Sequence, residues 1–296
     1  MSQVSRASTR TGDFPIGFRR GWSDWQKDTA ALIAYAVREG FGCIDWPGEA
    51  FDEAKQCMDA GLRVGSVDLP GDWAIYHSAD AGKRAEALET LSAHVEKWAA
   101  LGPMNHFAVM FPEDPAKPRS QNFEHMAAFW KEGAAVLEKH KAKLVIEGWP
   151  GKQSLCCTPE SLQAFFDAVP SPALGVNYDP SHLIRMGIDP MRFLEQFRDR
   201  VYHAHGKDAR VYPERLYQAG WETEADHTEG FGFGGVAWRY TIPGHGTTDW
   251  VGAFETLKAN GYEGCVSIEL EDQNFNGSEQ GEKDGLCFSR DYLRSC

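Results

Sequence analysis

The sequence lacks the features that mark membrane, secreted and nucleic-acid-binding proteins. No uninterrupted apolar run approaches the roughly 20 residues that a membrane helix needs. The N-terminal stretch MSQVSRASTRTGD is polar and has no apolar core segment, so we expect no secretory signal. There is no Lys/Arg-rich run, and 30 basic against 43 acidic residues give a formal charge of −13, which repels nucleic acid phosphates. We therefore expect a soluble, cytoplasmic protein with neither a nucleic-acid nor a membrane partner.

The seven cysteines also lack a pattern. They form no CxxC pair, and an odd number of scattered cysteines is typical of reduced thiols in a cytosolic protein. With 296 residues, 42% of them hydrophobic, the chain is long enough for one large α/β domain or two smaller ones. Such a chain buries enough surface to fold without a disulfide or a structural metal.

What the sequence does contain is an alternation of short apolar runs and longer amphipathic segments. The predicted strands are residues 14–18, 41–46, 62–69, 105–111, 143–149, 174–179, 201–206 and 265–270. The predicted helices are residues 24–40, 49–61, 80–101, 120–141, 158–169, 189–200, 248–261 and 285–294. Strands and helices that alternate at roughly 30-residue intervals predict an α/β fold, a single (β/α)8 TIM barrel.

The domain organisation follows from the same pattern. We expect a flexible N-terminal tail, residues 1–12, and one barrel domain, residues 13–296, because no linker-like break interrupts the alternation. A doubly wound sheet is the alternative, but no glycine-rich phosphate turn follows the first strand. Residues 208–247 contain FGFGG and PGHG and are predicted to be a long loop after the seventh strand. In a barrel, this loop would lie on the catalytic face as a lid or binding segment.

Four of the later apolar runs end in a potential metal ligand: Glu147, Asp179, His205 and Glu269. Because the carboxyl ends of barrel strands meet at one mouth, we expect these side chains to converge. A single acid at a strand end is more often a cap or a salt-bridge partner, but four on consecutive strands favour a site. Three adjacent carboxylates would repel one another, and a cation relieves the repulsion. The ligand set predicts one divalent ion, with Mn²⁺ preferred and Mg²⁺, Co²⁺ or Zn²⁺ as alternatives.

Other residues near the strand ends are weaker candidates. His182 follows Asp179 by three residues, where the strand is expected to open into a loop, and it either faces the mouth or binds the backbone. In HAHGKD, His203 and His205 alternate, so only one of them can face inward. Trp149 is placed to stack on a sugar or to pack in the core, and His245 either closes over the pocket or ends the long loop.

The sequence resembles the xylose-isomerase-like TIM barrel superfamily, in its sugar (phosphate) isomerase/epimerase branch. The matching motifs are EGWPG (147–151), NYDPSHL (177–183), HAHGKD (203–208), PGHG followed by DW (243–250), GYEG (261–264) and SIELED (267–272). They run in family order across the second half of the chain. They are specific for the fold and the metal site but not for the substrate, because this scaffold hosts isomerases, epimerases, dehydratases and endonucleases.

The resemblance implies that the cation is held by the four residues Glu147, Asp179, His205 and Glu269, and it selects His205 over His203. It also implies that Glu147 and Glu269 move a proton on opposite faces of the substrate, while the cation stabilises the metal-bound enediolate. His182 would bind a substrate oxygen, and Arg210 lies near the place where some relatives carry a substrate-binding arginine. Lys207 and Asp208 would orient the site or form an ion pair beneath it.

The function that we expect is a metal-dependent isomerase or epimerase acting on a ketose or keto-sugar, a small carbohydrate. A lyase is the alternative, because the same enediolate of a keto-sugar, inosose or keto-glycoside can expel a leaving group. An apurinic endonuclease would need further histidines and an Asp-x-His pair after the seventh strand, which the sequence lacks. A non-catalytic sugar-binding relative would be expected to have lost a ligand. Homo-oligomers are common in the family.

Overall fold

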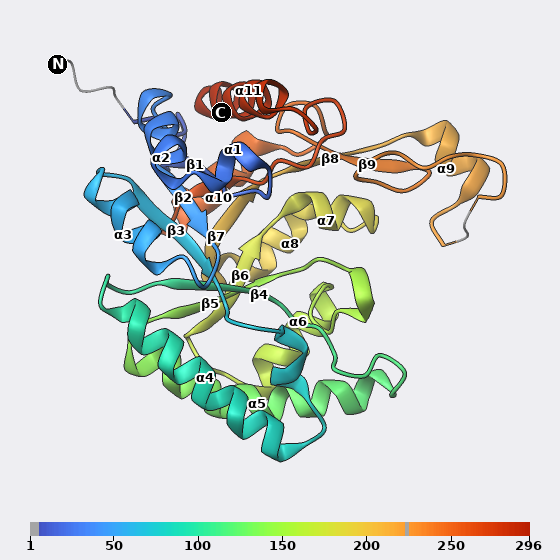
Figure 1. Ribbon diagram of the computed structural model, residues 1–296. Helices are drawn as coiled ribbons and strands as arrows, with labels where there is room; N and C mark the ends of the chain where they lie inside the picture. The colour runs from blue at the N-terminus through green and yellow to red at the C-terminus, as the bar shows by residue number, and fades with distance from the viewer. Residues whose placement is uncertain (1–5, 223–224) are drawn as a thin grey trace.

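The computed structural model describes residues 6–222 and 225–296, except for the side chain of Lys152. Within these residues, eight parallel strands close into a barrel, which confirms the predicted (β/α)8 fold (Figure 1). In spatial order the strands are β1 (Ile16–Arg19), β10 (Val266–Ile268), β7 (Val201–Gly206), β6 (Leu174–Tyr178), β5 (Lys143–Glu147), β4 (Asn105–Val109), β3 (Arg63–Asp68) and β2 (Cys43–Trp46). The pairing of Ile16 with Val266 closes the ring between the first strand and the last.

Most of the helices lie around the outside of these strands (Figure 1). They are α1 (Asp24–Lys27), α2 (Thr29–Arg38), α3 (Phe51–Asp59), α4 (Ala81–Ala99), α5 (Arg119–Lys139), α6 (Pro159–Ala168), α7 (Pro180–Arg185), α8 (Pro190–Phe197), α9 (Pro213–Ala219), α10 (Trp250–Ala259) and α11 (Glu279–Ser295). Many begin at an acid or hydroxyl N-cap, as the sequence leads one to expect. The Thr158 side chain accepts from the Ser161 N–H group at 3.2 Å, and Pro159 occupies the first turn of α6.

The predicted helix of residues 24–40 is divided in two. The Asp28 side chain accepts a hydrogen bond from the Ala31 N–H group at 3.0 Å, so α1 ends before it and α2 begins after it. The chain after β6 also differs from the prediction of a loop. Asp179 caps the short helix α7 by accepting from the Ser181 N–H group at 2.9 Å, and Pro180 fits its first position.

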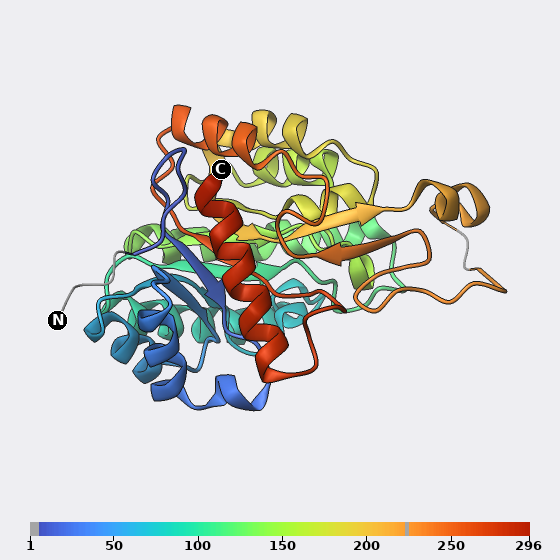
Figure 2. The same cartoon turned by 90° about the horizontal axis from the view of Figure 1, so that it is seen from above.

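The predicted long loop of residues 208–247 contains regular structure. β8 (Asp208–Val211) and β9 (Trp238–Thr241) pair as an antiparallel ribbon, and α9 lies between them in the chain. Figure 2 shows this ribbon beside the barrel, with α9 at its outer end and α11 lying across the outside of the barrel. The two strands, DARV and WRYT, form no apolar run of the kind that marks the barrel strands, and their pairing joins segments that are separated in the sequence.

The predicted N-terminal tail does not include residues 6–12. Ala7 is buried, its N–H group donates to the Gly40 carbonyl oxygen at 2.6 Å, and its carbonyl accepts from the Ile16 N–H group at 2.9 Å. Residues 1–5 lie outside the described residues. Among the residues that are described, none of the helices combines the length and apolar character needed to cross a bilayer.

Candidate metal centre

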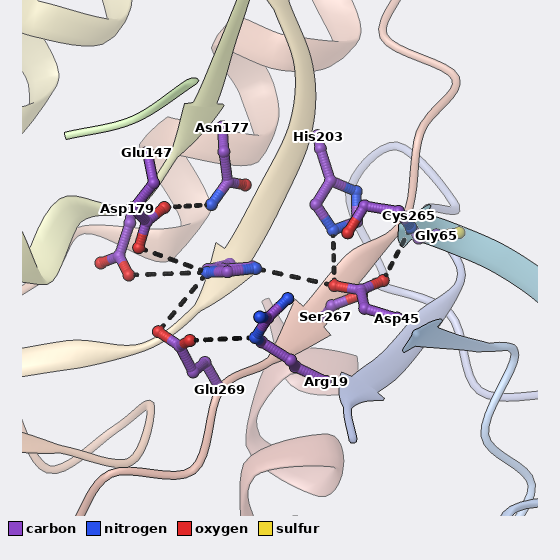
Figure 3. Close-up of polar contacts among 12 residues, drawn as sticks. Arg19, Asp45, Gly65, Glu147, Asn177, Asp179, His203, Cys265, Ser267 and Glu269 are labelled. Atoms are coloured by element: carbon purple, nitrogen blue, oxygen red, sulfur yellow. Dashed lines mark hydrogen bonds and ion pairs between the residues drawn. The ribbon is translucent and has the colours of Figure 1, made fainter. Parts of the chain in front are cut away.

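The four predicted ligands meet at the mouth of the barrel. Glu147 is the last residue of β5, Asp179 directly follows β6, His205 lies near the end of β7, and Glu269 directly follows β10. One ligand-type atom from each of them lies within 4.8 Å of the others. Figure 3 shows the three carboxylates gathered from these separate strands. Glu147, Asp179 and His205 are buried, and the Glu269 side chain retains 16% exposure.

The imidazole of His205 turns one nitrogen toward these carboxylates. Its Nδ1 atom lies 3.5 Å from Glu269 Oε2, 3.6 Å from Glu147 Oε1 and 3.8 Å from Asp179 Oδ2. Among the described residues, neither His205 Nδ1 nor Asp179 Oδ2 has a hydrogen-bond partner, although both are buried. Buried oxygen and nitrogen atoms that face one space without a hydrogen bond fit a hard or borderline divalent cation.

A buried lysine lies at the edge of the same site. The Lys207 ammonium contacts Glu269 and lies 3.2 Å from both Asp179 Oδ2 and Glu271 Oε2. Burial lowers the pKa of Lys207, but these three carboxylates outweigh it and hold the pKa well above its usual value. The ammonium therefore remains charged and offsets part of the negative charge. Asp208, by contrast, accepts hydrogen bonds from the backbone and hydroxyl of Thr248 and does not pair with Lys207.

A directed hydrogen-bond chain orients His182. The Arg185 guanidinium can only donate, and its Nη1 lies 2.8 Å from the Tyr240 hydroxyl oxygen. Tyr240 is therefore free to donate its own proton to His182 Nδ1, at 2.7 Å. His182 Nε2 then carries the hydrogen that it donates to Glu147 Oε1, also at 2.7 Å. Asn177 donates to the other oxygen of Glu147, so both oxygens of this carboxylate are held.

The two glutamates are kept ionised by different neighbours. Burial raises the pKa of Glu147, but the imidazoles of His205 and His182 outweigh it and lower the pKa well below its usual value. Burial likewise opposes ionisation of Glu269, and Lys207 and His205 lower its pKa below the ordinary range. Arg19 approaches Glu269 Oε1 at 3.5 Å. Both carboxylates therefore have the charge that a metal ligand or a base requires.

A second polar cluster lies against the opposite edge of the His205 ring. Asp45 Oδ2 lies 3.6 Å from His205 Nε2 and accepts a hydrogen bond from His203 Nε2 at 2.8 Å. Its Oδ1 accepts from the Ser66 N–H group at 3.0 Å and the Ser267 hydroxyl at 2.8 Å. His203 thus faces Asp45 rather than the three carboxylates. A carboxylate behind a ligating histidine is a common way of fixing the ring and its tautomer.

The remaining predicted residues lie apart from the four ligands. Trp149 packs edge-on against Phe111 with ring centres 5.9 Å apart. Arg210 is exposed on β8, with its guanidinium 5.5 Å from the centre of the Tyr212 ring. His245 packs at 4.8 Å against Phe288 of α11. The residues around the site that were not predicted include Arg19, Asn177, Arg185 and Tyr240. Asn177 could have been found, because it belongs to the NYDPSHL motif.

Comparisons with known proteins agree with this architecture. The family model described as xylose isomerase-like TIM barrel matches residues 33–292. YfiH of Bacillus subtilis (strain 168), a protein described as uncharacterized, is 34% identical over 152 residues, which cover 49% of this chain and 45% of YfiH. The inosose dehydratase of Lacticaseibacillus casei is 32% identical over 94 residues, which cover 32% of this chain and 29% of that enzyme. The matched segments span less than half the length of either relative.

A solved structure resembles nearly the whole chain. The 3-keto-D-glucoside 4-epimerase YcjR from E. coli, in its apo form, superimposes with a TM-score of 0.67. The match covers 94% of this chain and 99% of that chain at 16% sequence identity. At this identity, the likeness establishes the fold and leaves the activity to be argued from the site.

Proposed function

Because the chain belongs to the xylose isomerase-like TIM barrel family, we propose that it is a divalent-metal-dependent sugar isomerase or epimerase. It moves a proton on the carbon beside the carbonyl group of a ketose or keto-sugar. The observation that carries this proposal is the convergence of Glu147, Asp179, His205 and Glu269 within 4.8 Å. The unsatisfied buried atoms of Asp179 and His205 support a cation among them.

The proposed cation is Mn²⁺, held by these same four residues. Three carboxylates and one imidazole suit Mn²⁺, while the absence of a thiolate argues against a structural zinc site. When bound, the ion would polarise the substrate carbonyl and stabilise the negative charge that develops as the proton leaves. The buried Lys207 ammonium offsets part of the repulsion between the carboxylates of Asp179 and Glu269.

The two glutamates are the proposed proton carriers. Glu269 lines the pocket beside the centre and would face the incoming sugar, whereas Glu147 is buried and accepts a hydrogen bond from His182. One carboxylate removes the proton from one face of the sugar, and the other returns it from the opposite face. Tyr240 fixes the hydrogen of His182 on Nε2, and His182 would transfer this hydrogen bond from Glu147 to a substrate oxygen.

Solvent deuterium exchange tests the proposal. Mn²⁺-loaded protein is incubated in D₂O with D-fructose, a 3-keto-glucoside or an inosose, and the C–H signal beside the carbonyl is followed by NMR. We expect exchange with at least one class, and a loss of about 10²–10⁴-fold in rate in both Glu147→Gln and Glu269→Gln. Asp68→Asn is the control, because Asp68 pairs with Arg19 and is not a proposed ligand. Metal-loaded wild type that exchanges no proton on any of these sugars would refute the proposal.

A lyase is the second candidate, favoured by the similarity to an inosose dehydratase. It shares the proton-removal step but expels a neighbouring hydroxyl instead of taking the proton back. The same experiment separates the two activities. An epimerase returns the sugar with deuterium on the inverted carbon, whereas a dehydratase yields an unsaturated ketone and water.

A further inference from the structure

A pocket opens beside the candidate metal centre, next to β1 and β10. Glu269 lies in its wall, together with residues from the β1–α1 connection, the β10–α11 connection and the segment before β9. Four of the lining residues could contact a ligand in this pocket: Arg20, Trp22, Phe233 and Asn276. Since Glu269 is also a proposed proton carrier, a sugar bound at the metal centre would border directly on this pocket.

Trp22 is an exposed aromatic side chain on a fixed segment of backbone. Its indole is 80% exposed. On one side, the Gly21 N–H group donates to the Gln26 side chain at 2.6 Å, and on the other, the Ser23 hydroxyl donates to the buried Glu282 carboxylate at 2.5 Å. The backbone on both sides of Trp22 is held in this way, so binding has to order only its side chain, which is suited to contact a ligand.

Phe233 lies in the wall of the same pocket, on a tight turn. It is 41% exposed and has a φ of 53°, a conformation that is unfavourable for a bulky residue. The Tyr240 N–H group holds this turn by donating to the Phe233 carbonyl oxygen at 2.8 Å. Because the hydroxyl of Tyr240 orients His182, the strand β9 ties the position of Phe233 to that of the site. Strain kept in this way is often a mark of function.

The chemistry of the lining selects the class of ligand. Aromatic faces stack on the apolar face of a sugar or aryl ring. Arg20, whose Nε donates to the Gln26 carbonyl oxygen at 3.0 Å, offers further donors to hydroxyl groups. The adjacent pocket lined by Asp45, Asp68 and Trp73 contains none of the four proposed ligands, so it is a poorer continuation of the reacting sugar.

We propose that the pocket beside Glu269 is a subsite for the ring that a glycosidic bond joins to the reacting sugar. The substrate is then a keto-glycoside rather than a free ketose. This inference rests on the proposed function, because the metal centre defines where the reacting sugar lies. The wall of the pocket that Glu269 borders has the two exposed aromatic groups, Trp22 and Phe233, against which the second ring would stack.

The test is a comparison of ligands that differ only in that ring. Binding of phenyl and methyl glucosides, in both anomers, is measured by calorimetry on Mn²⁺-loaded protein. We expect one phenyl glucoside to bind about five- to tenfold more tightly than its methyl counterpart, the factor that one stacked ring contributes. Trp22→Ala and Phe233→Ala should each reduce this ratio, and Trp22→Phe should restore most of it. Tyr217→Ala is the matched control, since Tyr217 is 83% exposed on α9 and does not line the pocket.

The outcomes separate this inference from the proposed function. Equal binding of phenyl and methyl glucosides by wild type, no binding of either, or an equal loss of both in Trp22→Ala would overturn the subsite. None of these results depends on proton transfer. Conversely, a Trp22-dependent preference for the phenyl glucoside without deuterium exchange on any sugar would uphold the subsite and refute the isomerase or epimerase.

Discussion

Two polar residues of the early barrel strands, Asp68 and His106, have different neighbours from Asp179 and His205 of the late strands. Both oxygens of Asp68 on β3 are occupied by Arg19, at 2.8 and 2.9 Å, whereas Asp179 leaves Oδ2 without a hydrogen bond within the described residues. His106 on β4 lies beside His94, with ring centres 5.1 Å apart, and burial lowers its pKa to about 3. His205 is equally buried, but Glu147 and Glu269 raise its pKa well above the usual value.

The neighbouring charged side chains, rather than the residue type or its place in the fold, therefore decide which polar residue is free to bind a ligand. A bidentate guanidinium neutralises Asp68 and makes it structural. Three carboxylates around one imidazole leave negative charge that Lys207 and Arg19 offset in part, so the late cluster can still accept a cation. Four predictions test this contrast.

The largest effect is expected when a ligand is removed. Glu147→Ala and Glu269→Ala should each weaken Mn²⁺ binding by more than about 100-fold, which exceeds the usual effect of losing an outer partner of a metal ligand. Asp68→Asn should retain binding, because its carboxylate is already paired. Competition with a chromophoric chelator measures all three. Equal loss in Asp68→Asn would contradict the contrast between the two regions.

Lys207→Met should destabilise the metal-free protein by about 3 kcal/mol, because it leaves buried carboxylates without their cation. Saturating Mn²⁺ should restore much of this loss by binding to the folded state. Urea unfolding with and without Mn²⁺ provides the measurement. Lys83→Met is the control, since Lys83 is half-exposed and its pair with Glu113 contributes less than about 1 kcal/mol. A metal-free Lys207→Met protein as stable as wild type would show that the ammonium has no such role.

Asp45→Asn should weaken Mn²⁺ binding by about 10–100-fold without changing the circular dichroism spectrum. The two donors at Oδ1, Ser66 and Ser267, select the amide oxygen there, so the amide NH₂ would face the Nε2 atoms of His203 and His205. Because the amide NH₂ is a donor, it disfavours a hydrogen on Nε2 of His205. The ring hydrogen then lies on Nδ1, which loses the lone pair that would bind a cation. Unchanged affinity would mean that Asp45 does not position the ring.

The smallest effect concerns the early strands alone. His106 has a pKa of about 3 in the folded protein and an ordinary value of 6.5, so the unfolded chain binds the extra proton. The stability that neutral His106 contributes is complete above about pH 6.5 and is lost as the pH falls from there toward 3. His106→Leu should reduce the loss of stability between pH 7.5 and pH 5.5 by about 1 kcal/mol, measured by urea unfolding. The same loss in variant and wild type would argue against a neutral buried His106.

The sequence predicts the barrel and the convergence of the ligands for one physical reason. Parallel strands end at a common mouth, so Glu147 and Glu269 meet although 121 positions of the chain separate them. The ribbon β8–β9 was not predictable, because its strands DARV and WRYT form no apolar run and are held by their pairing with each other across the intervening segment. Contacts between distant segments also cannot be read from the sequence. Tyr240 could therefore not be identified as the residue that orients His182, nor Arg19 as the partner that neutralises Asp68.

The most direct test of the account is the location of the metal in crystals of Mn²⁺-loaded protein, read from anomalous diffraction at the manganese edge. We expect one Mn²⁺ per chain, bound to Glu147, Asp179, Glu269 and the Nδ1 atom of His205. An ion between Asp45 and His203 instead, or no ordered ion at saturating Mn²⁺, would contradict it.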